Sequence, residues 1–121
     1  MKTAALKRHS LLVFALLFAL CPVLCSCVSM AQRGAVGLAY QAYKKGDYVT
    51  ALRKLSEAES YQVEMSNERH AEISFLKGRC VEGMGNRAEA ASLYEYVIKT
   101  YPDTEFAARA KGRLEELRKA P

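Results

Sequence analysis

The chain has 121 residues, which is room for one domain. Half of the residues are hydrophobic and the formal net charge is +5, yet three of the 18 basic residues precede residue 27 and all 13 acidic residues follow it. Residues 27–121 therefore carry 15 basic and 13 acidic side chains, a net charge of +2. This near balance gives no strong case for nucleic-acid binding.

The first 26 residues have the pattern of an export signal. Lys2, Lys7 and Arg8 precede an uncharged apolar run at 11–20, and Pro22 breaks the helix before a zone of small residues. An uncharged stretch of about 20 residues is nominally long enough to span a bilayer, but only about half of this one is strongly apolar. We therefore expect the segment to be cleaved; a retained anchor and a later start of the chain are the alternatives.

The tetrapeptide Leu24-Cys25-Ser26-Cys27 resembles the lipobox of bacterial lipoproteins, with Leu at −3, a small residue at −1 and Cys at +1. The resemblance implies a diacylglyceryl thioether on Cys27, cleavage before it and acylation of the new amino group. Such multiple acylation gives stable anchoring, whereas one acyl chain holds a protein at only ~10⁴ M⁻¹. The chain would thus reach the membrane through a lipid on Cys27.

The residues after the lipobox bear on where the protein is held. Val28 stands where lipoproteins retained at the inner membrane of enteric bacteria have Asp, which favours the outer membrane and its periplasmic side. The alternative is ordinary signal-peptidase cleavage after Ala31, which would leave a soluble periplasmic protein that starts at Gln32.

Three of the four cysteines lie in or next to the leader, so the mature chain keeps Cys27 and Cys80. A lipidated Cys27 cannot form a disulfide, and Cys80 falls on the apolar stripe of a predicted helix. We expect Cys80 to be a buried, inert core residue rather than a nucleophile or a redox group. No Cys or His pairing has the spacing of metal ligands, and no cofactor is expected.

The mature chain shows helical periodicity throughout and no segment with the alternation of a strand. A short tether to residue 34 is followed by five predicted helices at about 35–45, 48–61, 68–84, 87–100 and 104–119. Glycine and a capping residue separate the paired helices, and Tyr101-Pro102 ends the fourth. The predicted packing stripes are Leu38, Ala39 and Ala42; Ala51, Leu52, Leu55 and Ala58; Ile73, Leu76, Cys80 and Met84; Ala90, Leu93, Tyr94, Val97 and Ile98; and Phe106, Ala110, Leu114 and Leu117.

A turn motif occurs twice, as Gly46-Asp47-Tyr48 and as Gly85-Asn86-Arg87, 39 residues apart. Each copy permits a positive φ and caps the next helix. Small residues recur in phase with these turns, and they are the expected helix–helix contacts: Ala39, Gly46, Ala51, Ala58, Gly78, Gly85, Ala90 and Gly112.

This pattern resembles the tetratricopeptide repeat, a helix–turn–helix unit of 34 residues. The resemblance covers roughly 35–119 and implies an all-α superhelix: two repeat hairpins, with the fifth helix as a C-terminal cap. The domains would be a signal peptide at 1–26, a lipidated N-terminus and tether at 27–34, and a repeat domain at 35–121.

In this repeat family the concave face is lined by the first helix of each unit. Carried over to this chain, that face holds aromatic, basic and acidic side chains: Tyr40, Tyr43 and Lys44, then Phe75, Arg79 and Glu82, then Arg109, Arg113 and Glu116. Such a groove suits an extended peptide with acidic groups or a C-terminal carboxylate. The alternative is that the arginines form a solvated face and the tyrosines belong to the core.

The sequence predicts binding rather than catalysis. His70 is the only His after the leader and is expected to face solvent, and no serine has a plausible His–acid pair. Because about three repeats are normally needed for stability, the protein would dimerise or dock on a larger partner, with Tyr94, Tyr96 and Tyr101 as candidate interface residues or as ordinary core and surface tyrosines.

The expected function is therefore an outer-membrane-anchored periplasmic adaptor in envelope assembly, with a protein or extended peptide as partner and no nucleic acid. The alternative is a soluble periplasmic subunit of a secretion, pilus or cell-wall machinery, also non-enzymatic.

Overall fold

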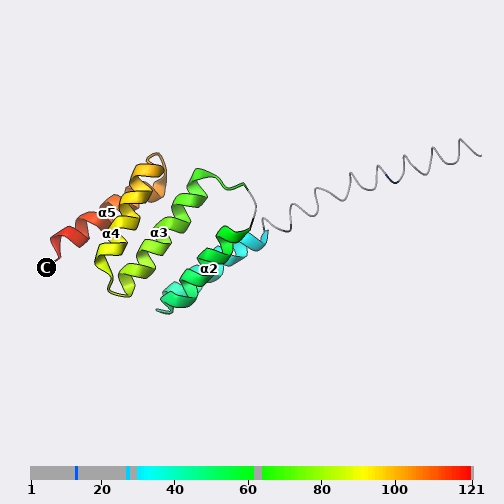
Figure 1. Ribbon diagram of the computed structural model, residues 1–121, viewed down its shortest axis with the longest axis horizontal. Helices are drawn as coiled ribbons and strands as arrows, with labels where there is room; N and C mark the ends of the chain where they lie inside the picture. The colour runs from blue at the N-terminus through cyan, green and yellow to red at the C-terminus, as the bar shows by residue number, and fades with distance from the viewer. Residues whose placement is uncertain (1–12, 14–26, 28–29, 62–63, 121) are drawn as a thin grey trace, which may run out of the picture.

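The structure, a computed structural model, describes residues 13, 27, 30–61 and 64–120. Its described part is all-α: helices pack as antiparallel hairpins one after another, and no described residue is in a strand (Figure 1). This confirms the predicted fold class of stacked helical hairpins. Residues 30–44 are helical and precede α2 (Tyr48–Ser60), α3 (Asn67–Gly83), α4 (Arg87–Thr100) and α5 (Glu105–Lys119).

The predicted turns are present. Gly46 and Gly85 have φ of +76° and +88°, the left-handed conformation that only glycine adopts without strain. Asp47 and Asn86 then cap α2 and α4 by accepting hydrogen bonds from the backbone amides of Thr50, at 3.0 Å, and Glu89, at 3.3 Å.

The core has two clusters of buried side chains that meet along α3. The first joins segment 30–44, α2 and the α3 face that carries Ile73, Leu76 and Cys80. The second joins the opposite side of α3 to α4 and α5, around Tyr94 and Phe75. The fold is therefore a row of alternating helices in which α2 and α4 are each sandwiched between two others.

The N-terminal boundary differs from the prediction. The expected tether at 29–34 is helical from residue 30 onward, and Gln32 is buried, with its amide donating to the carbonyl of Ala58 at 3.3 Å. Gly34 and Gly37 lie inside the helix instead of breaking it, because neighbouring side chains on its other face are anchored in the core. Residues 1–12, 14–26 and 28–29 lie outside the described residues, so the structure describes the predicted leader only at Val13.

Five residues of the predicted packing set are exposed: Gly46 and Gly85, which form the turns, and Leu38, Met84 and Gly112. Leu38 and Met84 are 48% and 54% exposed. Leu38 faces away from α2 and α3, and Met84 follows the last residue of α3 and serves as its C-cap. Gly112 is exposed too, and a Cβ added there would meet nothing within 4 Å, since no described helix covers that side of α5.

Gly78 is the opposite case and confirms the close helix contact that its position predicts. A Cβ at Gly78 would lie 2.7 Å from Cε1 of Tyr94, whose side chain is fully buried. Sequence reasoning missed a second contact of this kind: the ring of Tyr48 lies over Gly83, 2.3 Å from where a Cβ would stand. In both places an aromatic ring replaces the missing side chain.

Candidate functional site

The first helix of each hairpin, together with α5, contributes to one common face, which we call the A-helix face. It is formed by segment 30–44, α3 and α5, the three helices to which all nine residues predicted for partner binding belong. Six residues line a hollow of about 350 Å³ on this face, five of them predicted: Phe75, Arg79, Arg109, Gly112, Arg113 and Glu116.

Glu82 is the centre of an ion-pair network under this face. Arg113 of α5 donates to both of its carboxylate oxygens, with Nε at 3.3 Å from Oε2, and Tyr94 of α4 donates to Oε2 at 2.6 Å. Arg79 lies further off, with Nε at 4.0 Å from Oε2. Glu82 thus joins three helices, and its side chain is only 16% exposed.

The protonation states in this network follow from its contacts. Burial alone would raise the pKa of Glu82, but the hydrogen bonds from Arg113 and Tyr94 outweigh it and leave the pKa below its ordinary value. Burial and the carboxylate of Glu82 raise the pKa of Tyr94, so the phenol stays protonated and donates. The bond to Glu82 raises the pKa of Arg113. The network is therefore a fixed charge pair at neutral pH.

Tyr43 and Arg79 extend the network to the first hairpin. The guanidinium of Arg79 donates to the Tyr43 hydroxyl through Nη2 at 2.7 Å and Nε at 3.2 Å, and its carbon lies 5.7 Å from the ring centre. Nearby, burial and the carboxylate of Glu72 raise the pKa of Tyr40 to about 12. Lys44 is exposed at the end of its helix and takes no part.

These contacts correct the predicted roles of two residues. Glu82 and Arg113 were expected to face a partner, but they are committed to each other and to Tyr94. No local pattern predicts this pair, because the two residues are 31 positions apart and meet only when α5 packs on α3. Arg113 keeps a second contact, to Glu116 at the mouth of the hollow.

Arg109 remains as the cation best placed for a ligand. Its side chain is 52% exposed, its guanidinium carbon lies 5.1 Å from the ring centre of Phe106, and its ion pair is with Glu105, itself 63% exposed. An exposed pair of this kind contributes about 0–1 kcal/mol, so Arg109 can exchange Glu105 for a ligand carboxylate at little cost.

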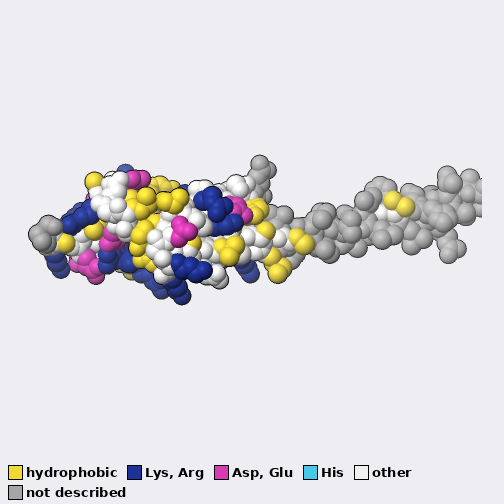
Figure 2. Space-filling model, turned by 90° about the horizontal axis from the view of Figure 1, so that it is seen from below, with side chains coloured by type: hydrophobic (Ala, Val, Ile, Leu, Met, Phe, Trp, Pro, Cys, Tyr) yellow, Lys and Arg dark blue, Asp and Glu magenta, His cyan; other side chains and the backbone are white. Residues whose placement is uncertain are grey.

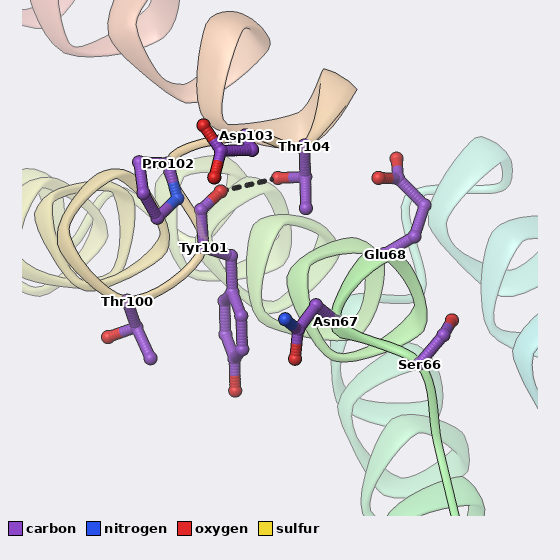
Figure 3. Close-up of a pocket in the computed structure, with 8 residues that line it drawn as sticks. All are labelled: Ser66, Asn67, Glu68, Thr100, Tyr101, Pro102, Asp103 and Thr104. Atoms are coloured by element: carbon purple, nitrogen blue, oxygen red, sulfur yellow. Dashed lines mark hydrogen bonds between the residues drawn. The ribbon is translucent and has the colours of Figure 1, made fainter.

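A second hollow of about 460 Å³ lies where the start of α3 meets the α4–α5 connection (Figure 3). Two of its polar side chains are used by the fold: Ser66 caps α3, and Thr104 caps α5 while donating to the carbonyl of Tyr101 at 2.8 Å. The ring of Tyr101 stacks on His70 with centroids 5.9 Å apart. This hollow is a product of two helix caps.

The cysteines and two of the candidate interface tyrosines differ in exposure. Cys80 is fully buried and burial raises its thiol pKa to about 11, whereas Cys27 is exposed. Tyr94 is core, while Tyr96 is 47% exposed. Within the described residues no cluster of three or more His, Cys, Asp or Glu could hold a metal ion. No helix of that part of the chain is both long and apolar enough to cross a membrane.

The charges on the surface are mixed. In the view of Figure 2, basic side chains recur along the lower edge of the helical domain, with fewer acidic ones and hydrophobic ones between them.

No protein-family model matches the chain, and neither a curated protein nor a solved structure matches it. The class that the fold and the site define is an all-α protein of stacked helical hairpins with an arginine-lined hollow on its A-helix face.

Proposed function

We propose that the protein is a lipid-anchored adaptor of the bacterial cell envelope, held in the outer membrane by Cys27 and facing the periplasm. Its tetratricopeptide-like hairpins bind an extended segment of a partner protein on the A-helix face. The observation that carries the proposal is the hollow in which Phe75, Arg79, Arg109 and Arg113 meet.

The chemistry of that hollow favours a peptide with an acidic group. Phe75 supplies an apolar wall, and Arg109 supplies a planar donor that can bind a carboxylate through two hydrogen bonds. The Glu82 network beneath holds α3 and α5 in a fixed relation, so the hollow is preformed and little ordering is needed on binding.

A substitution in α5 tests whether partners bind in the hollow. Arg109→Glu should lower the recovery of partners from solubilised membranes at least tenfold, because it replaces the exposed donor with a carboxylate that repels the acidic group of the ligand. A tenfold loss of affinity corresponds to about 1.4 kcal/mol of binding free energy. Arg118→Glu is the matched control: it makes the same charge change on the same helix, where Arg118 pairs with exposed Glu95 at 3.4 Å. Equal recovery of every partner with both variants would remove the site.

The anchor is tested separately by labelling cells with a clickable fatty acid. The wild-type protein should be labelled and membrane-bound, and Cys27→Ala should lose the label. A labelled Cys27→Ala protein would place the lipid elsewhere. An unlabelled wild-type protein in the periplasm would instead favour cleavage after Ala31.

A further inference from the structure

On the side of segment 30–44 that faces away from the core, no described helix packs. This side consists of Met30, Gly34, Gly37, Leu38 and Gln41, all exposed, and we call it the N-terminal edge. A Cβ added at Gly34 or Gly37 would meet nothing within 4 Å. Met30 and Leu38 are 69% and 48% exposed.

The internal repeat of this chain shows which kind of element covers the equivalent face of α3 and of α5. The residues 39 positions after Gly34, Gly37 and Gln41 are Ile73, Leu76 and Cys80, which form the α3 surface buried in one cluster with α2. A further 34 positions on stand Ala107, Ala110 and Leu114, which form the α5 surface buried in one cluster with α4. The equivalent surface is covered by a helix twice in this structure and is open at the N-terminal edge.

The glycines indicate which side chains the missing helix carries. The two glycines of α3, Gly78 and Gly83, each have a tyrosine ring over them, Tyr94 or Tyr48, whereas Gly112 in α5 is open. Glycine is among the poorest helix formers, so two uncovered glycines inside one helix weaken it with no packing in return. An aromatic ring placed over Gly34 or Gly37 would supply that packing.

Leu38 indicates whether the residue opposite it on a covering helix is polar or apolar. Its equivalent in α3 is Lys77, which pairs with Glu59 of the covering helix α2 at 2.6 Å. Leucine in that place calls for an apolar residue on the covering helix instead of an acid.

We propose that the N-terminal edge docks an amphipathic helix of a partner protein, in the place that α2 takes against α3, with an aromatic residue in its apolar stripe over Gly34 and Gly37. This inference concerns a different face from the hollow around Arg109 and does not rest on it.

Two other occupants fit the edge less well. A second copy could offer only segment 30–44 or α5 in this position, because α2 and α4, which cover the equivalent surfaces, are each already packed between two neighbours. A membrane surface would be met by bulky apolar side chains, whereas this edge has glycine at two of its five positions and an amide at a third.

A photo-crosslinking amino acid in place of Leu38, in the full-length protein and in the cells that produce it, tests the proposal. The expected product joins position 38 to another protein, and the crosslinked peptide maps to an amphipathic helix with an aromatic residue. Adding Gly34→Glu and Gly37→Glu should lower the yield at least tenfold. Glu favours helix more than Gly does, so these variants should stay folded, as circular dichroism would verify.

The matched control is Ala88→Glu with Ala108→Glu, which adds the same two charges at exposed helix positions away from this edge and should leave the yield unchanged. A product with a second copy, a product with lipid alone, a partner segment that is not helical, or no product would each overturn the proposal. A yield that both pairs of variants leave unchanged would overturn it as well.

Discussion

At the scale of single residues, two glycines in equivalent positions have opposite surroundings. Gly78 and Gly112 lie 34 positions apart, at the same point of the repeat. A tyrosine ring fills the space over Gly78, and the space over Gly112 is open. The same sequence signal therefore marks a tight contact inside the row of helices and an exposed position at its end.

This contrast predicts that replacing glycine with alanine lowers the free energy of unfolding at position 78 and raises it at position 112. Gly78→Ala should lower the free energy of unfolding by about 1–2 kcal/mol, because the added methyl overpacks against Tyr94, which is buried and hydrogen-bonded to Glu82. Gly112→Ala should raise it by up to about 1 kcal/mol through helix propensity alone. Urea denaturation of the two variants and the wild type measures both. A stabilised Gly78→Ala protein would mean that Tyr94 does not lie on Gly78.

Glu82 predicts a pH dependence. Because its folded pKa is lowered from the ordinary 4.5, its contribution to stability is complete above that value and is lost as the pH falls through the folded pKa. Glu82→Gln should cost about 2 kcal/mol at pH 7, the range for a hydrogen-bonded charge with little exposure. The difference from wild type should shrink on acidification below the ordinary pKa.

The control for this prediction is Glu95→Gln, whose carboxylate is 60% exposed and pairs with exposed Arg118. It should change stability little at any pH. Unfolding curves at several pH values for both variants compare the two sites. A constant difference between wild type and Glu82→Gln from neutral to acid pH would contradict the assigned charge network.

At the scale of elements, the helices and turns were largely predictable from local signals. Glycine with a following cap placed the turns at Gly46 and Gly85, and the apolar period placed α2 to α5 within about two residues, which is the usual uncertainty of helix ends. The burial of Ala51, Leu55 and Tyr94 followed from the same period.

The features that local sequence signals did not predict depend on contacts between residues far apart in the chain. The helix start at residue 30 requires Gln32 to reach Ala58, and the role of Glu82 requires α5. Leu38 looked like a core residue because its period fits segment 30–44, but no described helix lies on that side. The candidate hollow was predicted in outline, whereas the division of its arginines into structural and exposed ones needed the structure.

The positive φ of Gly85 in the α3–α4 turn predicts how substitutions there change stability. Gly85→Ala should lower the free energy of unfolding by about 1–2 kcal/mol, because φ of +88° forces the new Cβ against the backbone. Gly85→Asn should cost less, since Asn tolerates this conformation better. Thermal unfolding followed by circular dichroism ranks the three proteins. Equal stability for all three would mean that the α3–α4 turn does not need a positive φ.

At the scale of the whole molecule, the row of helices carries a structural ion-pair network and the two surfaces proposed for binding. The Glu82 network ties α3, α4 and α5 together, and the exposed side chain of Arg109 lies above it on the A-helix face. The N-terminal edge is a distinct surface at the other end of the row. If both proposals hold, the protein would bind two partner segments at once, and the proposed lipid on Cys27 would keep the assembly at the membrane.

The most direct test of the central claim is a photo-crosslinking amino acid at Glu116, which lines the hollow with a side chain that is 63% exposed. In the full-length, membrane-bound protein it should join an acidic segment of a periplasmic partner. That product should disappear with Arg109→Glu and persist with Arg118→Glu. A product that survives Arg109→Glu, or the absence of any protein product, would contradict a peptide-binding role for the A-helix face.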